Sequence, residues 1–505
     1  MNKNYFSYEG CVFDNETFNI KSNGKSFFSP IPIFYKPKIE KKLFITINYT
    51  NQCNLNCDYC YRNKKDKVKA NATDSKRLLD QTLSLIERKM KKKYEEFVFS
   101  FGLTCEPMLN LNVLKQLFET IENKENYMFT EKDFKGDVKI IVKSLEKELN
   151  AKNQNNDDIS FLNQLLLDRE LKNKLKFNIN DIDEKSRFII FNNDIHISRV
   201  IRLNRSILES KFKKLIKVKK QVMYTFWCMS NGTIVNNDVI QFIKQTGINP
   251  FWISIDVNKK SHDEHRPFYD KKDSFDIVKQ NITILTKNGI DVKLSTVITN
   301  PNDDLLSYLY EAQKLHVKKV HMTFWRKKDS YTNDNLENLK NQYRKVYHQL
   351  YKDILQGDYK LLLLLSEDKI TEPLRFLLRR EKLIRRCDWG RQLIIDSYGD
   401  VWPCLYFAEK ENYKIANIYH KKLKVIKSKI PENSYSKECF NCSVRTLCGG
   451  YCRYTAIMEN DSIDKKSEFE CALRKLFAEE SLKLLIDLYK AGYNLKKLYY
   501  DFLDK

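Results

Sequence analysis

Several features that define common protein classes are missing from this chain of 505 residues. Its longest apolar patch, residues 361–365, is far shorter than the roughly 18 apolar residues of a membrane-spanning helix. The N-terminus, "MNKNYFSYEG", lacks the apolar core of a signal peptide. The seven histidines show no metal-ligand spacing, and no Walker, Rossmann or Ser-His-Asp pattern stands out. We therefore expect a soluble cytoplasmic protein that has no membrane partner.

The chain has 13 cysteines and a formal net charge of +23. Thiols stay reduced in the cytoplasm, so this many cysteines indicates metal or redox chemistry and not a disulfide framework. The charge could indicate nucleic-acid binding, but the basic residues are scattered through a chain that is rich in Lys, Asn and Ile throughout. We therefore do not expect nucleic acid as a partner.

Short apolar strands alternate with amphipathic helices along much of the chain. Examples of the helices are residues 74–90, with an Asp or Ser cap, 112–123 and 274–289. The predicted strands are residues 43–48, 97–102, 222–227, 251–256, 291–298 and 319–325. Such alternation predicts an α/β fold with a parallel sheet, and six units suggest a partial (β/α)6 barrel similar to a TIM barrel. The active face would then lie at the C-terminal ends of the strands.

Composition divides the chain into segments. We expect a barrel over residues 43–345, interrupted by a Lys- and Asn-rich helical insertion at 124–220. The other expected segments are an N-terminal segment at 1–42, a helical linker at 346–386, a Cys-rich module at 387–471 and a C-terminal helix at 472–505.

Three cysteines lie close together directly after the first predicted strand. Cys53, Cys57 and Cys60 are spaced C-x3-C-x2-C within "YTNQCNLNCDYCYRN". A structural zinc ion needs four ligands, and no fourth Cys or His is nearby. Three thiolates suit a 4Fe–4S cluster better, because the fourth iron can then bind a substrate or a cofactor.

This loop resembles the signature of the radical SAM superfamily, including the aromatic Tyr59 before the last cysteine. The resemblance implies that the open iron of the cluster chelates S-adenosylmethionine (SAM). Reduction by the cluster would then release a 5′-deoxyadenosyl radical, which abstracts hydrogen from the substrate. A reductase or a flavodoxin-type protein is implied as the electron donor, and no catalytic side chain is assigned.

Other motifs agree with the resemblance. "FGLTCEPMLN" (101–110) lies where the family has Gly-Gly-Glu-Pro, with Thr104 and Cys105 in place of the two glycines. The resemblance implies that Glu106 holds the SAM ammonium through a charge-assisted hydrogen bond. "SNGTIVN" (230–236) and "SIDVNKKSHDEHRP" (254–267) resemble two further family stretches. The implied SAM contacts are Tyr59, Glu106, Asn231, Ser254 and Arg266, although ordinary turn and capping chemistry would also explain the last three.

A second set of cysteines follows near the C-terminus. Cys387 and Cys404 frame the pattern C-x11-G-x4-C around Gly399. Five more complete the set: Cys439, Cys442, Cys448, Cys452 and Cys471. Spacing alone leaves one or two zinc knuckles open. The pattern resembles the SPASM module, which carries auxiliary 4Fe–4S clusters in radical SAM enzymes that modify peptides and proteins.

The SPASM resemblance implies three 4Fe–4S clusters in all. Auxiliary cluster II would be held by Cys439, Cys442, Cys448 and Cys471, and auxiliary cluster I by Cys387, Cys404 and Cys452. Some family members add a cysteine six residues before the first of these seven, where this chain has Glu381. We therefore expect an open or non-cysteine position on auxiliary cluster I, which could bind a substrate thiolate.

The resemblance implies a maturase that installs a thioether or carbon–carbon crosslink in a ribosomally made precursor peptide. The alternative is an anaerobic sulfatase-type maturase, which makes formylglycine. Those sulfatase enzymes carry an Asp after the second SPASM cysteine, whereas Leu405 follows Cys404 here. The 124–220 insertion is long enough to help dock the peptide. A zinc-stabilised, basic nucleic-acid-binding protein stays open as a reading of another class. We expect Cys11 to be a packing residue. Packing is also the favoured role of Cys105 and Cys228, although both follow barrel strands and could approach the reaction cavity.

Overall fold

The structure is a computed structural model of the chain. It describes residues 5–15, 17–26, 42–60, 71–86, 94, 96–103, 105–124, 223–246, 248, 250–383, 392–408, 410–420 and 435–503. Nearly all of the expected insertion at 124–220 lies outside these residues, and so does Cys387.

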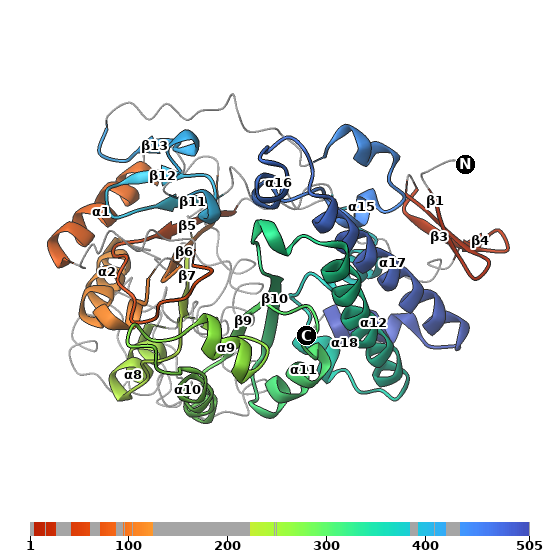
Figure 1. Cartoon of the computed structure of the whole chain (residues 1–505), viewed down its shortest axis with the longest axis horizontal. Coiled ribbons are helices and arrows are strands. Elements are labelled where there is room, and N and C mark those ends of the chain that lie inside the picture. Colours follow the sequence, from red (N-terminus) through yellow and green to blue (C-terminus); the bar gives the residue numbers. More distant parts are fainter. Residues whose placement is uncertain are drawn as a thin grey trace, which may run out of the picture.

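Six parallel strands form the central sheet, as the alternation of strands and helices predicted (Figure 1). They are β5 (Lys42–Ile47), β6 (Glu96–Phe101), β7 (Met223–Ser230), β8 (Phe251–Ser254), β9 (Val292–Ile298) and β10 (Lys319–Phe324). Each strand pairs with the next one in the chain, and β7 is in register with β6 from Met223 to Cys228. The partial (β/α)6 barrel is confirmed. All six C-terminal strand ends meet at one edge of the sheet.

Helices that connect the strands cover the outer side of this sheet. They are α1 (Ala72–Leu85), α2 (Leu111–Lys124), α8 (Asn237–Thr246), α10 (Phe275–Lys287) and α11 (Leu305–Lys314). The short helix α9 (Lys259–His265) follows β8 and its end lies against the loop after β5. The expected Asp or Ser cap of α1 is wrong, because the Asn71 side chain accepts hydrogen bonds from the N–H groups of Thr73 and Asp74. Asn is as good an N-cap as Ser or Asp, so the helix begins two residues earlier.

The sheet continues beyond β5 into the Cys-rich part of the chain. β11 (Gln392–Ile395) pairs in parallel with β5, and β12 (Asp400–Trp402) and β13 (Ala416–Asn417) follow as antiparallel strands. A backbone hydrogen bond of 2.8 Å from Asn48 N to Ile395 O extends this pairing. The start of the Cys-rich module is thus part of the same sheet as the barrel.

A helical layer lies on the other side of the molecule (Figure 1). Its helices are α12 (Asn333–Leu355), α13 (Lys360–Leu364), α14 (Glu372–Arg379), α15 (Arg445–Cys448), α16 (Arg453–Asn460), α17 (Glu468–Lys490) and α18 (Leu495–Leu503). The boundary expected at residue 345 falls inside α12. The last segment holds two helices and not one, because the chain turns at Gly492, where φ is +74°. In the part of the chain that the structure describes, no helix has the length and apolar character to cross a bilayer.

The N-terminal segment forms a small antiparallel sheet, which the sequence pattern did not reveal. Its strands, in spatial order, are β1 (Tyr5–Tyr8), β2 (Cys11–Asp14), β3 (Asn19–Ser22) and β4 (Lys25–Ser26). Within these strands, the side chains of Cys11, Phe13 and Ile20 are buried. In Figure 1 this sheet lies at the end of the molecule formed by α15 and α17, far from β5.

Candidate active site

The three-cysteine loop follows β5 at the active edge of the sheet. Two backbone hydrogen bonds hold it against the end of α9 and the residues that follow: Asp58 N to His265 O at 3.2 Å and Asn56 N to Pro267 O at 2.8 Å. The His265 imidazole also contacts the Asp58 carboxylate at 2.7 Å. These contacts fix the loop that carries the thiols to a second part of the barrel.

Cys53, Cys57 and Cys60 are half-buried and are not in disulfides. Burial raises the pKa of the Cys57 thiol to about 12, although the Arg266 guanidinium opposes this. Among the described residues, no three Cys, His, Asp or Glu side chains converge enough to bind one metal ion. A 4Fe–4S cluster takes each thiolate on a separate iron, so its ligands need not meet at one point. The thiol-only donor set fits such a cluster, and this assignment stays a prediction.

Glu106 lies directly behind the loop and is completely buried. Its Oε1 accepts hydrogen bonds from Ser230 Oγ at 2.9 Å and Met108 N at 3.1 Å, and its Oε2 accepts one from Asn231 N at 2.6 Å. Burial raises the pKa of Glu106 to about 7, and the three hydrogen bonds oppose that rise. A carboxylate can accept about four hydrogen bonds. Within the described residues Glu106 accepts three such bonds, two on Oε1 and one on Oε2.

The local backbone brings Asn231 between Glu106 and the cysteine loop. Its Nδ2 donates to Asn54 Oδ1 at 2.8 Å and lies 3.6 Å from Cys53 Sγ. Gly232 follows with φ of +76°, and a Cβ there would lie 2.8 Å from the Ile253 side chain. The Ser-Asn-Gly turn is thus required by packing, and it places Asn231 beside a predicted cluster ligand.

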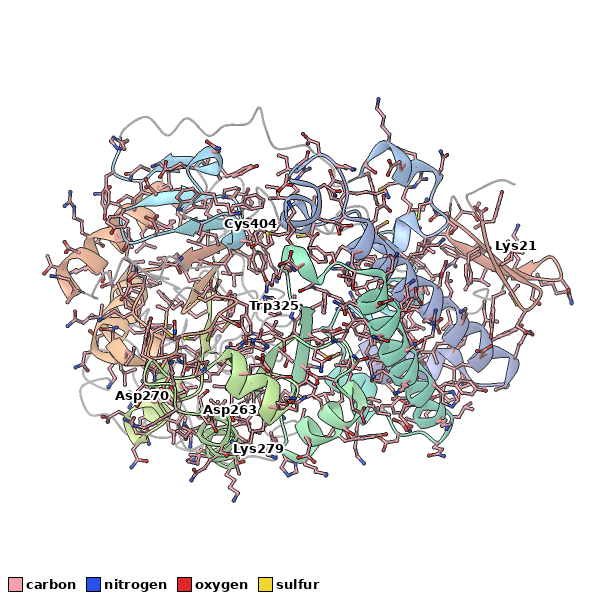
Figure 2. All side chains as sticks on the ribbon, viewed as in Figure 1. Lys21, Asp263, Asp270, Lys279, Trp325 and Cys404 are labelled. Carbon is pink, nitrogen blue, oxygen red and sulfur yellow. The ribbon has the colours of Figure 1, made fainter. Side chains whose placement is uncertain are left out.

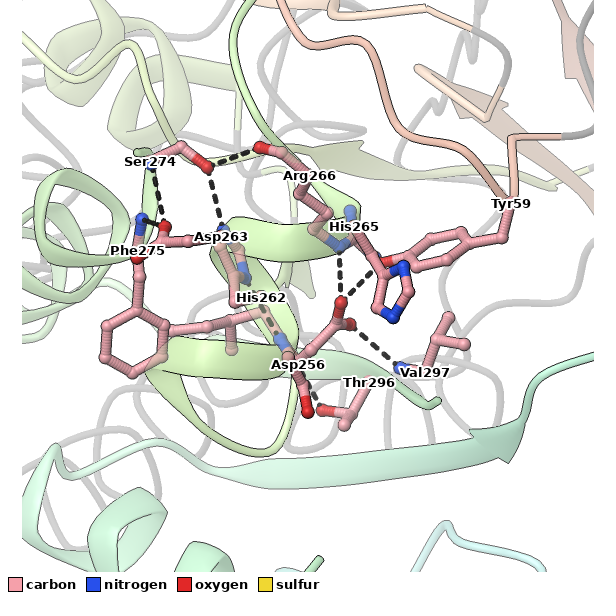
Figure 3. Close-up of polar contacts among 12 residues, drawn as sticks. Tyr59, Asp256, His262, Asp263, His265, Arg266, Ser274, Phe275, Thr296 and Val297 are labelled. Atoms are coloured by element: carbon pink, nitrogen blue, oxygen red, sulfur yellow. Dashed lines mark hydrogen bonds and ion pairs between the residues drawn. The ribbon is translucent and has the colours of Figure 1, made fainter. Parts of the chain in front are cut away.

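Asp256, two residues beyond β8, links the remaining candidates (Figure 3). Its Oδ2 accepts hydrogen bonds from Tyr59 Oη and, at 3.2 Å, from Arg266 Nε. Its Oδ1 accepts from Val297 N at 3.1 Å, and the side chain has no exposed surface. The Arg266 guanidinium also lies 5.0 Å from the centre of the Tyr59 ring. Tyr59 and Arg266 are therefore brought together by a carboxylate that was not among the predicted site residues, although it stands in the motif quoted for them.

His262 stabilises the positions of Asp256 and Arg266 through hydrogen bonds. Asp256 N donates to His262 Nδ1 at 3.2 Å, so the proton of the neutral ring is on Nε2, which contacts Ser274 Oγ at 2.9 Å. Ser274 Oγ in turn donates to Arg266 O at 2.7 Å. Burial lowers the pKa of His262 to about 3, so the ring is neutral near pH 7. His262 therefore orients Asp256 and Ser274 as a neutral ring.

Two of the predicted SAM contacts sit differently from the others. Ser254 is the last residue of β8 and is buried there, two residues before Asp256. Glu106 already bonds three protein donors, so it joins the ends of β6 and β7 as well as facing the loop. Of its two unusual neighbours, Cys105 is buried and Thr104 lies outside the described residues.

Six of the seven C-terminal cysteines lie in the described part of the chain, and all six are half-buried free thiols. Cys404 precedes a short 3-10 helix (Leu405–Phe407), and Cys452 caps α16. Both thiols act electrostatically on Tyr406, whose pKa is raised chiefly by burial. A second group consists of Cys448, Cys439 and Cys442 around Tyr435. Burial raises the pKa of Tyr435, and electrostatic interaction with these three thiols raises it further. Their division between two clusters stays a prediction.

Arg326, beyond the end of β10, reaches toward the first of these groups. Its guanidinium lies 4.2 Å from the centre of the Tyr406 ring, which stacks on Tyr454 at 4.8 Å. Its Nη1 is buried and has no hydrogen-bond partner within the described residues. Figure 2 shows Cys404 and Trp325, the residue before Arg326, both near the middle of the view. The sequence pattern contained no signal for this contact.

The three cysteines outside the motifs are all buried. Cys11 is 1% exposed, which confirms its prediction as a packing residue. Cys228 on β7 has no exposed surface, and Cys105 is 9% exposed. Packing is thus the role that the structure shows for these side chains.

Comparison with known proteins gives three findings. A family profile described as "4Fe-4S single cluster domain" matches residues 44–163. A curated relative, the cysteine-type anaerobic sulfatase-maturating enzyme of Clostridium novyi (strain NT), is 25% identical over 246 residues. That alignment covers 44% of this chain and 62% of the relative, so the chain spans less than two thirds of the relative's length.

Solved structures show the same fold over most of the chain. Native anSMEcpe with bound AdoMet aligns with a TM-score of 0.55 and 15% identity, over 89% of this chain and 99% of that one. The structure of anSMEcpe with bound AdoMet and Kp18Cys peptide gives a TM-score of 0.54 over the same shares. The chain thus matches a single-cluster 4Fe–4S domain profile over residues 44–163 and shares the fold of anSMEcpe.

Proposed function

We propose that this protein is a radical SAM maturase that installs a thioether or carbon–carbon crosslink in a ribosomally synthesised peptide. The observation that carries the proposal is the meeting of the three-cysteine loop with Glu106 and Asn231 at the active edge of the sheet. The peptide as substrate class is supported by anSMEcpe, whose fold this chain shares and which has been solved with Kp18Cys peptide. An electron donor of the reductase or flavodoxin type belongs to the proposal.

The proposed cofactors are SAM and three 4Fe–4S clusters. When bound, they supply a reductively generated 5′-deoxyadenosyl radical that abstracts hydrogen from the substrate. Cys53, Cys57 and Cys60 would hold the SAM cluster. Glu106 would accept hydrogen bonds from the amino group of SAM, and the Asp256–Arg266 pair would keep Tyr59 and the cysteine loop in place. The C-terminal cysteines would hold the two auxiliary clusters.

Replacing Glu106 by Gln is expected to weaken SAM binding about tenfold to hundredfold, because a charge-assisted hydrogen bond is lost. Wild-type affinity is expected to fall as the pH drops below about 7, by up to about tenfold per pH unit. The reason is that the raised pKa leaves Glu106 neutral at lower pH, and a neutral carboxyl attracts the amino group less.

The measurement is SAM binding to the reconstituted protein at several pH values. The control is Glu119→Gln, which changes an exposed carboxylate on α2 and should leave both affinity and pH dependence unchanged. Equal affinity of Glu106→Gln and wild type would contradict the role proposed for Glu106.

The choice between crosslinking and formylglycine formation rests on the residue after Cys404. Leu405 begins the short 3-10 helix there, and its apolar side chain cannot accept a proton. The sulfatase-type enzymes have an Asp in this place. Formylglycine formation remains the second candidate, because the curated relative is a sulfatase-maturating enzyme.

Mass spectrometry of a treated peptide separates the two activities. The reconstituted enzyme is incubated anaerobically with dithionite, SAM and synthetic cysteine-containing peptides. A crosslink removes two hydrogens from the peptide and keeps its sulfur, whereas formylglycine made from cysteine loses sulfur and gains oxygen. An aldehyde product that reacts with hydrazide would overturn the crosslinking proposal in favour of the second candidate.

Two finer parts of the proposal can be tested separately. We propose that auxiliary cluster I has a position without a cysteine ligand, since Glu381 stands where some relatives have one more cysteine. Spectroscopy that shows four cysteine ligands on both auxiliary clusters would contradict this. The peptide-docking role of the 124–220 insertion is tested by deleting it, and unchanged peptide affinity would refute that role.

A further inference from the structure

The N-terminal sheet carries one buried polar side chain that reaches into the Cys-rich part of the chain. Asn15, directly after β2, has no exposed surface. Its Nδ2 donates to Cys442 O at 2.8 Å, and the two residues are 427 positions apart in the sequence. Its Oδ1 accepts hydrogen bonds from Thr446 N at 3.1 Å and from Thr446 Oγ1. The nitrogen and the oxygen of the Asn15 amide thus both form hydrogen bonds with one segment that is remote in the sequence.

That segment is the loop between the predicted ligands Cys439 and Cys448. A 3-10 helix (Lys437–Asn441) and the single turn of α15 form it, and short local hydrogen bonds such as Cys442 N to Cys439 O at 3.1 Å and Arg445 N to Cys442 O at 3.3 Å connect them. Short helical turns of this length are not stable alone. Asn15 bonds one carbonyl before α15 and one N–H inside it, and thereby sets the distance between the two halves of the loop.

Apolar packing and further polar contacts attach the N-terminal sheet to the same region. Tyr8 Oη of β1 donates to Asp487 Oδ2 of α17 at 3.4 Å, and Phe13 and Ile20 are buried in the extended hydrophobic core that also includes Val444 and Leu447 of the loop. At the far side, Lys490 Nζ of α17 lies 3.0 Å from Glu9 Oε2. In Figure 1 the sheet lies beside α15 and α17 and not beside the barrel.

We propose that the N-terminal sheet is a structural part of the auxiliary cluster II site and that Asn15 positions the Cys439–Cys448 loop for cluster binding. This inference rests on the proposed ligand set Cys439, Cys442, Cys448 and Cys471. Asn15 is a positioning residue: it bonds the main chain of Cys442 and not the thiol. Without it, the buried N–H of Thr446 loses its partner, and the loop loses its hydrogen bonds to the N-terminal sheet.

The test compares Asn15→Ala with Thr17→Ala after anaerobic reconstitution. Thr17 is exposed, and its hydroxyl donates to Asp14 Oδ2 at 2.7 Å within the same turn, so this control changes the sheet without touching the loop. Asn15→Ala is expected to lower the iron content from about twelve to about eight per chain, while Thr17→Ala keeps about twelve.

A double-variant experiment identifies the lost cluster. Adding Cys439→Ala and Cys442→Ala to Asn15→Ala should remove no further iron, whereas adding Cys53→Ala, Cys57→Ala and Cys60→Ala should remove about four more. A general loss of folding would reduce all clusters together and would not give this pattern.

Hydrogen–deuterium exchange of residues 436–449 in the iron-free protein provides a second readout. Exchange there should be faster in Asn15→Ala than in Thr17→Ala. If Asn15→Ala is insoluble, Thr446→Val takes its place, since it removes only the hydroxyl donor to Asn15, and a partial loss of one cluster is then expected.

Full iron content together with unchanged exchange in the soluble variant would overturn the inference. A wild-type protein that binds only about four irons would instead overturn the proposed auxiliary clusters, and the exchange measurement would still decide whether Asn15 holds the loop. If residues 436–449 exchange as slowly in Asn15→Ala as in the wild type, the positioning role is refuted as well.

Discussion

Replacing Cys53, Cys57 and Cys60 together with alanine is expected to lower the iron content from about twelve to about eight per chain and to abolish SAM cleavage. Three half-buried thiols on one loop are the proposed ligands of the SAM cluster, and the two auxiliary clusters have their own cysteines. Iron and acid-labile sulfide are measured after anaerobic reconstitution of the wild type and the variant.

The matched control is Cys228→Ala, because Cys228 is a fully buried cysteine of β7 and no predicted ligand. It should keep about twelve irons. About four irons in the wild type, lost in the triple variant, would keep the SAM cluster but leave the C-terminal cysteines as a zinc or structural module. A colourless, zinc-loaded protein that binds nucleic acid in a salt-dependent way would overturn the whole enzymatic proposal.

The second large effect is expected at Asp256. Asp256→Asn should lower the free energy of unfolding by about 3–5 kcal/mol, because it leaves the Arg266 guanidinium buried without its counter-charge. The side chains of this pair are 0% and 9% exposed, so water cannot compensate for the loss. Tyr59 would also lose a charged acceptor beside the cysteine loop. The measurement is the shift of the urea unfolding midpoint.

Asp270→Asn is the control for this variant. Asp270 pairs with Lys272 at 2.7 Å, but both side chains are more than half exposed, and Asp270 lies at the lower left of the molecule in Figure 2. Its replacement should change stability by no more than about 0.5 kcal/mol. Asp256→Asn combined with Arg266→Met should recover part of the loss, since no unpaired charge then remains. Equal stability of the Asp256 and Asp270 variants would contradict the role given to this pair.

The strands of the barrel could be predicted because each is a short apolar run between amphipathic helices. The run at 251–256 is an example, and the structure ends that strand at Ser254, since Asp256 must turn toward Arg266. The cysteine loop, Glu106 and Asn231 could be located because their spacing after each strand matches a family motif. Local patterns of this kind depend only on neighbours in the sequence.

Contacts between remote segments could not be predicted in the same way. The strands at residues 5–26 have two to four residues each, which is too short for a clear alternation of apolar and polar positions. The role of Asn15 depends on its hydrogen bonds to Cys442 and Thr446, which lie more than 400 residues later in the sequence. The stacking of Arg326 on Tyr406 is similar, because it joins the last barrel strand to the Cys-rich part.

The pairing of β5 with β11 also determines when the sheet can be completed during synthesis of the chain. β5 leaves the ribosome early, whereas its neighbour Gln392–Ile395 is made after more than three quarters of the chain. Until then Asn48 lacks the carbonyl of Ile395, so the start of the cysteine loop is held on one side only. Contacts between such distant segments form slowly. Iron delivery to this loop is therefore expected to follow the synthesis of β11.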